Sequence, residues 1–251
     1  MSEKDRRDIL LSRAREFVER SKETDYVMPI ILPFIPAIMM AIGSILLIIG
    51  FITWFIHGGI LVVIGFVTIL SGIIINFYVI YKWIERRNKH FERTLLFFEI
   101  IGEIAIILGF KRTYIIKTRL NELRAINSTM RSALGNTILT ILPLYIYYVY
   151  HFLNKDFAKH SEKERLLLNE IFDELKERNQ LFIRRLEEFR DVPDRSTLLY
   201  FILTFLTGGL FLIYWVYTLT KDPNTHFESH SVIERDIMDT LANIVARTKE
   251  H

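Results

Sequence analysis

Two long apolar runs constrain the fold of this chain more than any other feature of its sequence. Residues 37–55 and 60–81 contain no Asp, Glu, Lys or Arg. At about 1.5 Å per residue, a helix over either run is long enough to cross a hydrocarbon core of roughly 30 Å. The only polar or flexible residues between the runs are His57, Gly58 and Gly59. We therefore predict a tight hairpin of two membrane-spanning helices.

The residues that flank this hairpin predict its orientation. A charged amphipathic helix is expected over residues 3–22, and basic residues follow the hairpin directly from Lys82, whereas its turn has no Lys or Arg. Because basic residues are retained on the cytoplasmic side, both ends of the hairpin are expected there. We predict a multi-pass protein of the cell membrane, with the lipid bilayer as its partner and its N-terminus in the cytoplasm.

Charge balance and the absence of cysteine exclude several classes of function. The chain has 32 basic and 29 acidic residues and a net charge of +3, so no nucleic-acid partner is expected. It has no cysteine, which removes disulfides, thiolate catalysis and cysteine metal sites. Although 51% of the residues are hydrophobic, 24% are charged. The charged residues form blocks that alternate with apolar blocks, as in a membrane protein.

The second constraint is an internal repeat. A shift of 136 residues, without a gap, superposes an early stretch on a late one. The matched residues are Thr68, Leu70, Gly72, Tyr78, Tyr81, Asn88, His90, Phe91 and Glu92 on Thr204, Leu206, Gly208, Tyr214, Tyr217, Asn224, His226, Phe227 and Glu228. A middle copy aligns Asn154, Phe157, His160, Ser161, Glu164 and Arg165 with Asn224, Phe227, His230, Ser231, Glu234 and Arg235. We predict three related copies.

The copies divide the chain into four parts. These are residues 1–57 with the surface helix and first span, 58–130 with copy one and cytoplasmic or interfacial helices, 131–193 with copy two and a heptad-like helix, and 194–251 with copy three. The repeat core consists of glycines and aromatic residues: Gly72, Tyr78, Tyr81, Tyr147, Tyr150, Gly208, Gly209, Tyr214, Trp215 and Tyr217.

Each copy is expected to be an apolar helix followed by an amphipathic surface helix. Ser161-x-x-Glu164 and Ser231-x-x-Glu234 have the pattern of capping boxes that would start the surface helices of copies two and three. The predicted fold class is therefore all-α, as a polytopic helical membrane protein with internal repeats.

Two topologies are compatible with the later apolar segments. In the preferred one, residues 134–153 and 197–219 are each a single span, so that the chain crosses four times and residues 154–194 lie on the far side. In the other, Pro143 and the Gly208-Gly209 pair mark the tips of re-entrant hairpins. Ten-residue arms would reach only about 15 Å, which is half of the core.

The heptad-like helix of copy two predicts an interaction surface. Its apolar seam, with one polar position, is Leu168, Phe172, Leu175, Asn179, Phe182, Leu186 and Phe189. The three- and four-residue steps indicate helix pairing, either within the chain or with a second copy or protein partner through residues 161–190. The alternative interpretation is an amphipathic helix that packs on its own protein or on the membrane.

Copy three carries a motif that resembles a known family. The motif is Thr207-x-Gly209-Leu210-Phe211-x-Ile213-Tyr214-Trp215. It is similar to the Thr-x-Gly-Ile-Tyr-x-x-Tyr-Trp core of a family of small prokaryotic integral-membrane domains of uncharacterised function. Copy one keeps Gly72 and Tyr78 but has Ser71 and Val79 in place of the Thr and Trp. The resemblance implies a helical membrane domain and brings neither a catalytic residue nor a cofactor.

Histidines are the best polar candidates for a site. His90 and His226 occupy one repeat position, and His160 and His230 occupy another. Histidines just outside a membrane could bind metal or sense pH. Metal ligation needs three or four groups to converge, so a local role at a helix start or an interface is the simpler interpretation. No catalytic residue, metal site or cofactor is predicted.

The predicted function is an integral membrane scaffold or protein-interaction protein without evident catalytic activity. A small channel or transporter would suit inverted repeats, but no span carries the buried charge usual in an ion or substrate path. A membrane-bound enzyme would need a nucleophile, a base or a metal constellation, which the sequence does not reveal. Convergence of His226, His230 and Glu234 at one point would instead indicate metal chemistry.

Overall fold

The structure is a computed structural model that describes residues 3–57, 59–142, 144–178 and 188–248. Every element in these ranges is a helix, which confirms the all-α prediction. The elements are α1 (Glu3–Thr24), the 3-10 helix η1 (Leu32–Phe34), α2 (Ile35–Ile52), α3 (Trp54–His57), α4 (Ile60–Ile107), α5 (Thr113–Asn127), α6 (Ala133–Leu139), α7 (Tyr145–Arg178), α8 (Thr197–Leu206) and α9 (Leu210–Thr248).

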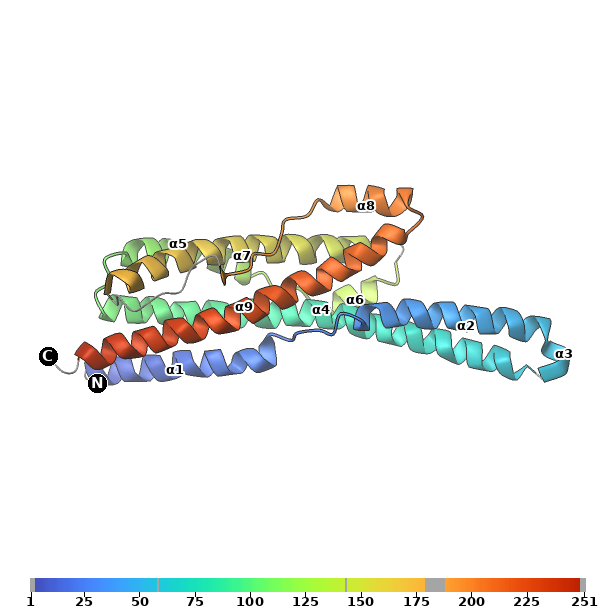
Figure 1. Cartoon of the computed structure of the whole chain (residues 1–251), viewed down its shortest axis with the longest axis horizontal. Helices are drawn as coiled ribbons and strands as arrows, with labels where there is room; N and C mark the ends of the chain where they lie inside the picture. Colours follow the sequence, from blue (N-terminus) through green and yellow to red (C-terminus); the bar gives the residue numbers. More distant parts are fainter. Residues whose placement is uncertain (1–2, 58, 143, 179–187, 249–251) are drawn as a thin grey trace.

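A hairpin of α2 and the first part of α4 projects from one end of the molecule (Figure 1). Its two helices are present as predicted, and both are long and apolar enough to cross a membrane. The outward side chains are large and apolar: Ile48, Ile52 and Leu70 are 60%, 78% and 59% exposed. A contiguous exposed apolar surface of this kind marks contact with a membrane or with a partner.

Two glycines allow α2 and α4 to approach closely within this hairpin. A Cβ atom at Gly43 would lie 2.8 Å from the Gly65 carbonyl oxygen, and one at Gly65 would lie 2.9 Å from the Gly43 carbonyl oxygen. These separations are too short for a van der Waals contact, so only glycine fits at either position. Ala41, two residues before Gly43 on the same helix, is exposed.

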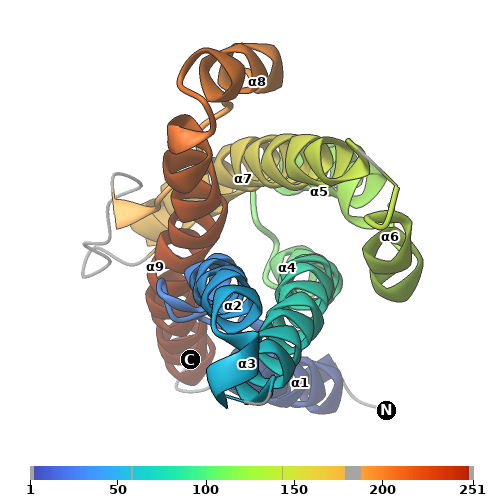
Figure 2. The same ribbon diagram turned by 90° about the vertical axis from the view of Figure 1, so that its right-hand side faces the viewer.

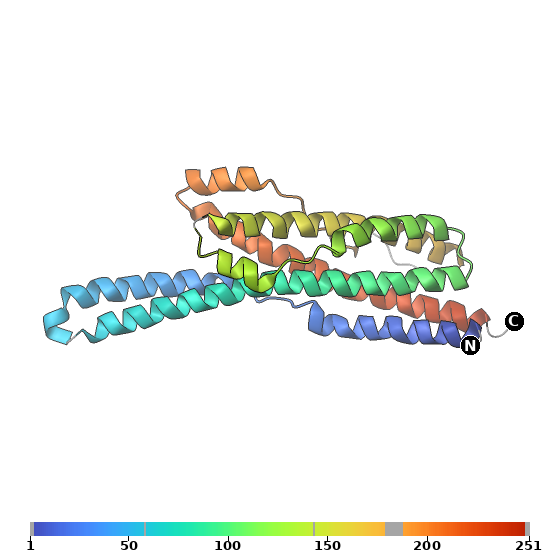
Figure 3. The same cartoon turned by 180° about the vertical axis from the view of Figure 1, so that it is seen from behind.

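The second part of α4 lies in a helical bundle with α1, α5, α7 and α9 (Figures 2 and 3). Leu168, Phe172 and Leu175 of the predicted seam are buried in the main core of this bundle. They pack inside their own chain. Phe189 joins the same core from beyond the end of α7. The other seam residues lie outside the described residues: Asn179, Phe182 and Leu186.

The predicted capping boxes are wrong. Ser161 lies in the middle of α7 and Ser231 in the middle of α9, so each apolar helix continues into its surface helix without a break. The physical reason is that the buried face of each long helix continues through the polar segment. In α7 this face holds, at three- and four-residue spacing, the buried residues Phe157, His160, Glu164 and Leu168.

The preferred four-span arrangement is also not formed. Residues 134–153 are divided between α6 and α7, and residues 197–219 between α8 and α9. Gly208 and Gly209 at the second break have φ angles of +57° and +93°, which glycine adopts without steric cost. Leu144, after the first break, also has a positive φ of 68°. Each segment therefore forms a short helical hairpin.

An aromatic core joins the three longest helices. Trp83 of α4 packs edge-on against Tyr150 of α7 at 5.9 Å between ring centroids, and Tyr150 packs against Trp215 of α9 at 5.3 Å. Three of the predicted repeat-core residues are buried: Gly72, Tyr150 and Trp215. Tyr78 and Tyr214, by contrast, are exposed. The half-buried members of the predicted core are Tyr81, Tyr147 and Tyr217.

Three asparagines hold the segments that lead into α2, α6 and α8. Each donates a hydrogen bond from Nδ2 to a backbone carbonyl and accepts one at Oδ1 from a backbone N–H. The pairs are Asn224 with Met28 O and N (2.7 and 3.1 Å), Asn88 with Arg131 O and N (2.6 and 3.2 Å), and Asn154 with Pro193 O and Arg195 N (3.1 and 3.0 Å). Each long helix, α4, α7 or α9, therefore fixes the start of a different apolar helix, α6, α8 or α2.

We predict that Gly43→Leu separates α2 from α4 and lowers the thermal stability of the chain, whereas Ala41→Leu does not. The side chain added at position 43 meets the α4 backbone, at a cost of about 1–3 kcal/mol for overpacking. Thermal unfolding of the full chain in detergent measures the difference between the two variants. Equal midpoints for the two would contradict the close packing.

Candidate functional site

Four histidines converge inside the bundle. His90 comes from α4, His160 from α7, and His226 and His230 from α9, and all four are 0% exposed. They are the four histidines that the repeat alignment pairs. Glu164 of α7, also 0% exposed, lies among them. The three longest helices thus meet at one buried polar cluster, where a role at a helix start or an interface was predicted for each histidine.

Four atoms of this cluster face one another at nearly equal distances. His90 Nε2 lies 3.2 Å from His160 Nε2 and 3.2 Å from His226 Nε2. Glu164 Oε2 lies 3.4 Å from His160 Nε2 and 3.3 Å from His226 Nε2. One ligand atom from each of these four residues can be chosen so that all four atoms lie within 4.8 Å of one another.

The opposite ring nitrogen of each of these three histidines contacts an atom that can only accept a hydrogen bond. The Nδ1 distances are 2.8 Å from His160 to Asn127 Oδ1, 2.9 Å from His226 to the Arg190 carbonyl, and 3.1 Å from His90 to Asp25 Oδ1. Asn127 is oriented by its Nδ2, which donates to the Phe91 carbonyl at 2.8 Å. In neutral His160 and His226 the proton is therefore on Nδ1, and Nε2 presents a lone pair. His90 Nδ1 lies near Asp25 but forms no hydrogen bond with it.

Burial and neighbouring charges together shift the pKa values of the histidines and of Glu164. It lowers the pKa of His160 to about 4 and the pKa of His90 well below its ordinary value, because it disfavours the imidazolium form. Burial alone would also lower the pKa of His230, but Glu164 and Glu234 raise it to about 10. Burial alone would raise the pKa of Glu164, but the charge on His230 holds it well below its ordinary value.

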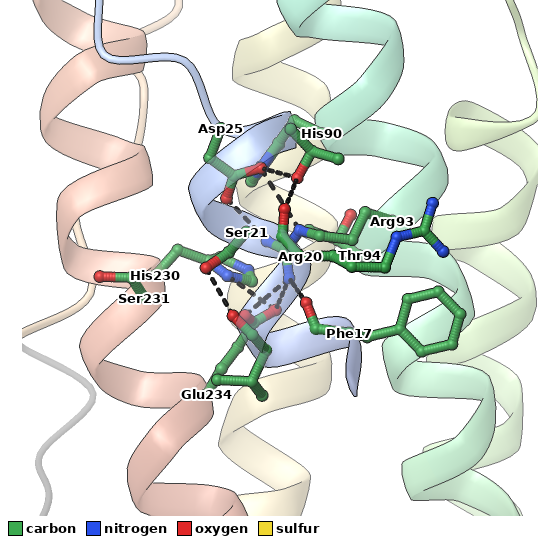
Figure 4. Close-up of polar contacts among 12 residues, drawn as sticks. Phe17, Arg20, Ser21, Asp25, His90, Arg93, Thr94, His230, Ser231 and Glu234 are labelled. Atoms are coloured by element: carbon green, nitrogen blue, oxygen red, sulfur yellow. Dashed lines mark hydrogen bonds and ion pairs between the residues drawn. The ribbon is translucent and has the colours of Figure 1, made fainter. Parts of the chain in front are cut away.

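His230 and Arg93 link the cluster to two further carboxylates. His230 Nε2 lies 2.6 Å from Glu164 Oε1, and its Nδ1 lies 3.0 Å from Glu234 Oε1. Arg93 Nη1 donates to both oxygens of Glu234 at 2.7 Å, and its Nη2 donates to Asp25 Oδ2 at 2.7 Å (Figure 4). Because Asp25 also contacts His90, these pairs lead from Glu164 back to the facing imidazoles.

The arrangement has the chemical character of a metal-ligand set. Neutral imidazole nitrogens and a carboxylate oxygen are ligands of zinc and of other divalent transition metals. The residues that could hold an ion are His90, His160, His226 and Glu164. All four are 0% exposed, so the cluster offers no surface on which a substrate could bind.

The sequence identified only part of this site. The alignment singled out the four histidines but could not show that they meet, because the interpretation of Ser161 and Ser231 as helix starts separated them from the apolar helices. Glu164 and Glu234 were aligned, yet they were assigned to helix caps. The signal that could have found them is their i, i+4 spacing from His160 and His230, which places each pair on one helix face.

Comparison with known families supports an uncharacterised domain. The sequence profile of a domain of unknown function (DUF4234) matches residues 195–245, which cover α8 and most of α9, with His226, His230 and Glu234. No curated protein and no solved structure matches the chain. The matched family has no catalytic description, which is compatible with the predicted absence of enzymatic activity.

We predict that Arg93→Met strongly destabilises the chain, by about 3–5 kcal/mol, because it leaves Asp25 and Glu234 buried without their shared cation. The matched control is Arg124→Met. Arg124 pairs with Glu99 at 2.9 Å, but both side chains are partly exposed, so its loss should cost about 1 kcal/mol or less. Denaturant unfolding of both variants in detergent measures the difference, and similar losses would contradict the role given to Arg93.

Proposed function

We propose that this chain is an integral membrane scaffold without catalytic activity, in which a two-span hairpin anchors a cytoplasmic helical bundle. The observation that carries the proposal is the projecting hairpin of α2 and α4, whose exposed side chains are apolar along both helices. A bilayer would remove this surface from water. Lys82 and Lys89 follow the apolar part of α4 and favour the cytoplasmic side for the bundle.

The short helical hairpins are proposed to enter the same membrane as re-entrant elements. Phe205, Leu206 and Leu210 at the α8–α9 turn are 81%, 72% and 71% exposed, and Ile141 and Leu144 at the α6–α7 turn are 69% and 67% exposed. Both turns lie at the end of the bundle from which the long hairpin projects (Figure 1). With ten residues, α8 reaches about 15 Å, or half of the hydrocarbon core.

The backbone of the α8–α9 turn supports this placement. Non-helical backbone is costly in lipid unless its polar groups are bonded within the protein. Here Gly209 N donates to Thr204 O at 2.8 Å, and Phe211 N donates to Thr207 Oγ1 at 2.9 Å. Leu212 N donates to Gly209 O at 3.0 Å. The turn therefore satisfies these N–H groups without water.

The three copies are proposed to be structural repeats arranged around one axis. Two sets of contacts support this. Asn88, Asn154 and Asn224 occupy the same repeat position, and each bonds the segment before an apolar helix: α6, α8 and α2 respectively. Their neighbours in the repeat also meet in one small core cluster, which contains Phe91, Phe157 and Phe227. In this arrangement each copy consists of an apolar helix, α2, α6 or α8, and the long helix that follows it.

A partner contact through residues 161–190 remains part of the proposal, but the contact surface is now proposed to be polar rather than the apolar seam. Leu168, Phe172 and Leu175 are already buried in the core of their own chain, so a second copy or another protein would bind the outward, polar side of α7. The scaffold is preferred over an enzyme because the polar cluster is closed to solvent. It is preferred over a transporter because the later apolar segments are short hairpins.

We predict the topology from single-cysteine variants of this cysteine-free chain. In intact cells, an impermeant maleimide should label Phe55→Cys at the hairpin turn from outside, because Phe55 is fully exposed there. Lys159→Cys and Glu228→Cys, both at exposed bundle positions, should react only after permeabilisation. Labelling of Lys159→Cys in intact cells would instead place residues 154–194 outside and overturn the re-entrant arrangement.

We also predict that each of the three repeat asparagines stabilises the fold. Asn88→Ala, Asn154→Ala and Asn224→Ala each leave one backbone N–H and one carbonyl without their partner, at a cost of roughly 1–3 kcal/mol. Asn224→Ala should cost the most, because Asn224 Oδ1 also accepts from buried Arg86 at 2.8 Å. Asn121→Ala is the control, because Asn121 is exposed and accepts a hydrogen bond from the side chain of Arg124 at 3.0 Å. Unfolding midpoints of the four variants measure these costs. A loss of stability in only one of the three repeat variants would count against structural equivalence of the copies.

A further inference from the structure

We propose that His90, His160 and His226, through Nε2, and Glu164, through Oε2, bind one divalent transition-metal ion, with Zn²⁺ as the ion that fits best. This inference goes beyond the scaffold function and does not depend on the membrane topology. The ligands come from the three longest helices, α4, α7 and α9. One ion would therefore join all three.

Four of the six distances between the ligand atoms match those of a tetrahedral site. Zinc binds imidazole nitrogen and carboxylate oxygen at about 2.0–2.2 Å, which places neighbouring ligand atoms of a tetrahedron about 3.3–3.6 Å apart. Four distances in this set are 3.2, 3.2, 3.3 and 3.4 Å, and the other two are no longer than 4.8 Å. A small adjustment of the side chains would therefore give an ion at the centre bonds of ordinary length.

The same spacing is unfavourable for the ligands alone. Because Nδ1 carries the proton in neutral His160 and His226, both of their Nε2 lone pairs face His90 Nε2 at 3.2 Å. A proton on His90 Nε2 could be donated to only one of these two lone pairs. Glu164 Oε2 is fully buried and receives no hydrogen bond from any residue in the described ranges. A cation at the centre would satisfy all four atoms at once.

The surrounding residues have the form of a second coordination shell. Metal-bound histidines donate their other N–H to a carboxylate, a backbone carbonyl or a similar acceptor, which fixes the ring and its tautomer. Asp25, the Arg190 carbonyl and Asn127 supply one such acceptor to each of the three rings. Glu164 is oriented in turn by His230, 2.6 Å from its other oxygen.

The closed set of ligands points to a structural ion. Catalytic zinc sites keep one position open for water or substrate, whereas structural sites have four protein ligands. Here four protein atoms surround the centre, and each ligand is 0% exposed. The ion would fix α4, α7 and α9 relative to one another, and its removal should loosen the bundle.

The test uses the full chain purified in detergent without chelator. Elemental analysis should find one Zn²⁺ per chain, either as purified or after Zn²⁺ is added to chelator-treated protein. Zn²⁺ should raise the thermal midpoint of the metal-depleted chain by about 5 °C or more. Co²⁺ in its place should give the intense visible absorption of a tetrahedral site, a signal that is independent of stability.

Matched variants identify the ligands. Glu164→Gln should weaken Zn²⁺ binding at least about 100-fold, and Asn127→Leu, which removes a second-shell acceptor, about 10–100-fold. His151→Gln should bind as the wild type does, because His151 is exposed and contacts Thr197 instead. If Glu164→Gln does not fold, the metal content and the Co²⁺ spectrum of the wild type still decide. A wild type that binds no Zn²⁺ or Co²⁺ and shows no shift of its midpoint would overturn the proposal.

Discussion

The burial of ionised side chains where three helices meet is the constraint on which the rest of the structure depends. Asp25, Glu164 and Glu234 are nearly or fully removed from water together with Arg93 and His230. An unpaired charge in such a place costs several kcal/mol, so every carboxylate must find a cation or a donor. The pairs join α4, α7 and α9 to Asp25, the residue directly after α1, and each helix is thereby held in one position and one rotation. An apolar core alone would tolerate several packings, because hydrophobic burial is not directional.

This constraint explains why the long helices are continuous. A helix that ended at Ser161 or Ser231 would direct Glu164 and Glu234 to backbone N–H groups at its start, as in a capping box. In the continuous helices, each Glu instead lies one turn from a histidine, on the face that the aromatic and leucine residues already bury. The polar segment therefore belongs to the core, and the serines bond locally or to a neighbouring segment, as Ser161 does with Val192.

The sequence predicted the helices better than it predicted the buried polar cluster at which the three longest helices meet. The uncharged runs specified α2 and the first part of α4, because length and hydropathy are local properties. The breaks at Gly208-Gly209 and near Pro143 were identified as one of two alternatives, since Gly and Pro act locally as well. The cluster depends on pairs of residues 62 to 141 positions apart, such as Glu164 with His226 and Arg93 with Glu234. No local periodicity contains that information. Only the repeat alignment reached across such distances, and it placed the histidines in pairs without bringing the pairs together.

The cluster and the proposed anchor share one helix, and this has a mechanical consequence. His90 lies nine residues after Tyr81, about 13 Å along the continuous α4, so a displacement of the projecting hairpin is carried directly to the imidazole. In the same way α7 and α9 connect His160 and His226 to the two short hairpins at their N-terminal ends. A centre that fixes the three helices thus also fixes the three apolar turns relative to one another. If an ion occupies this centre, its bonds to the four ligands determine how the three apolar turns are arranged toward a membrane. Those bonds are buried in the bundle, well outside the membrane itself.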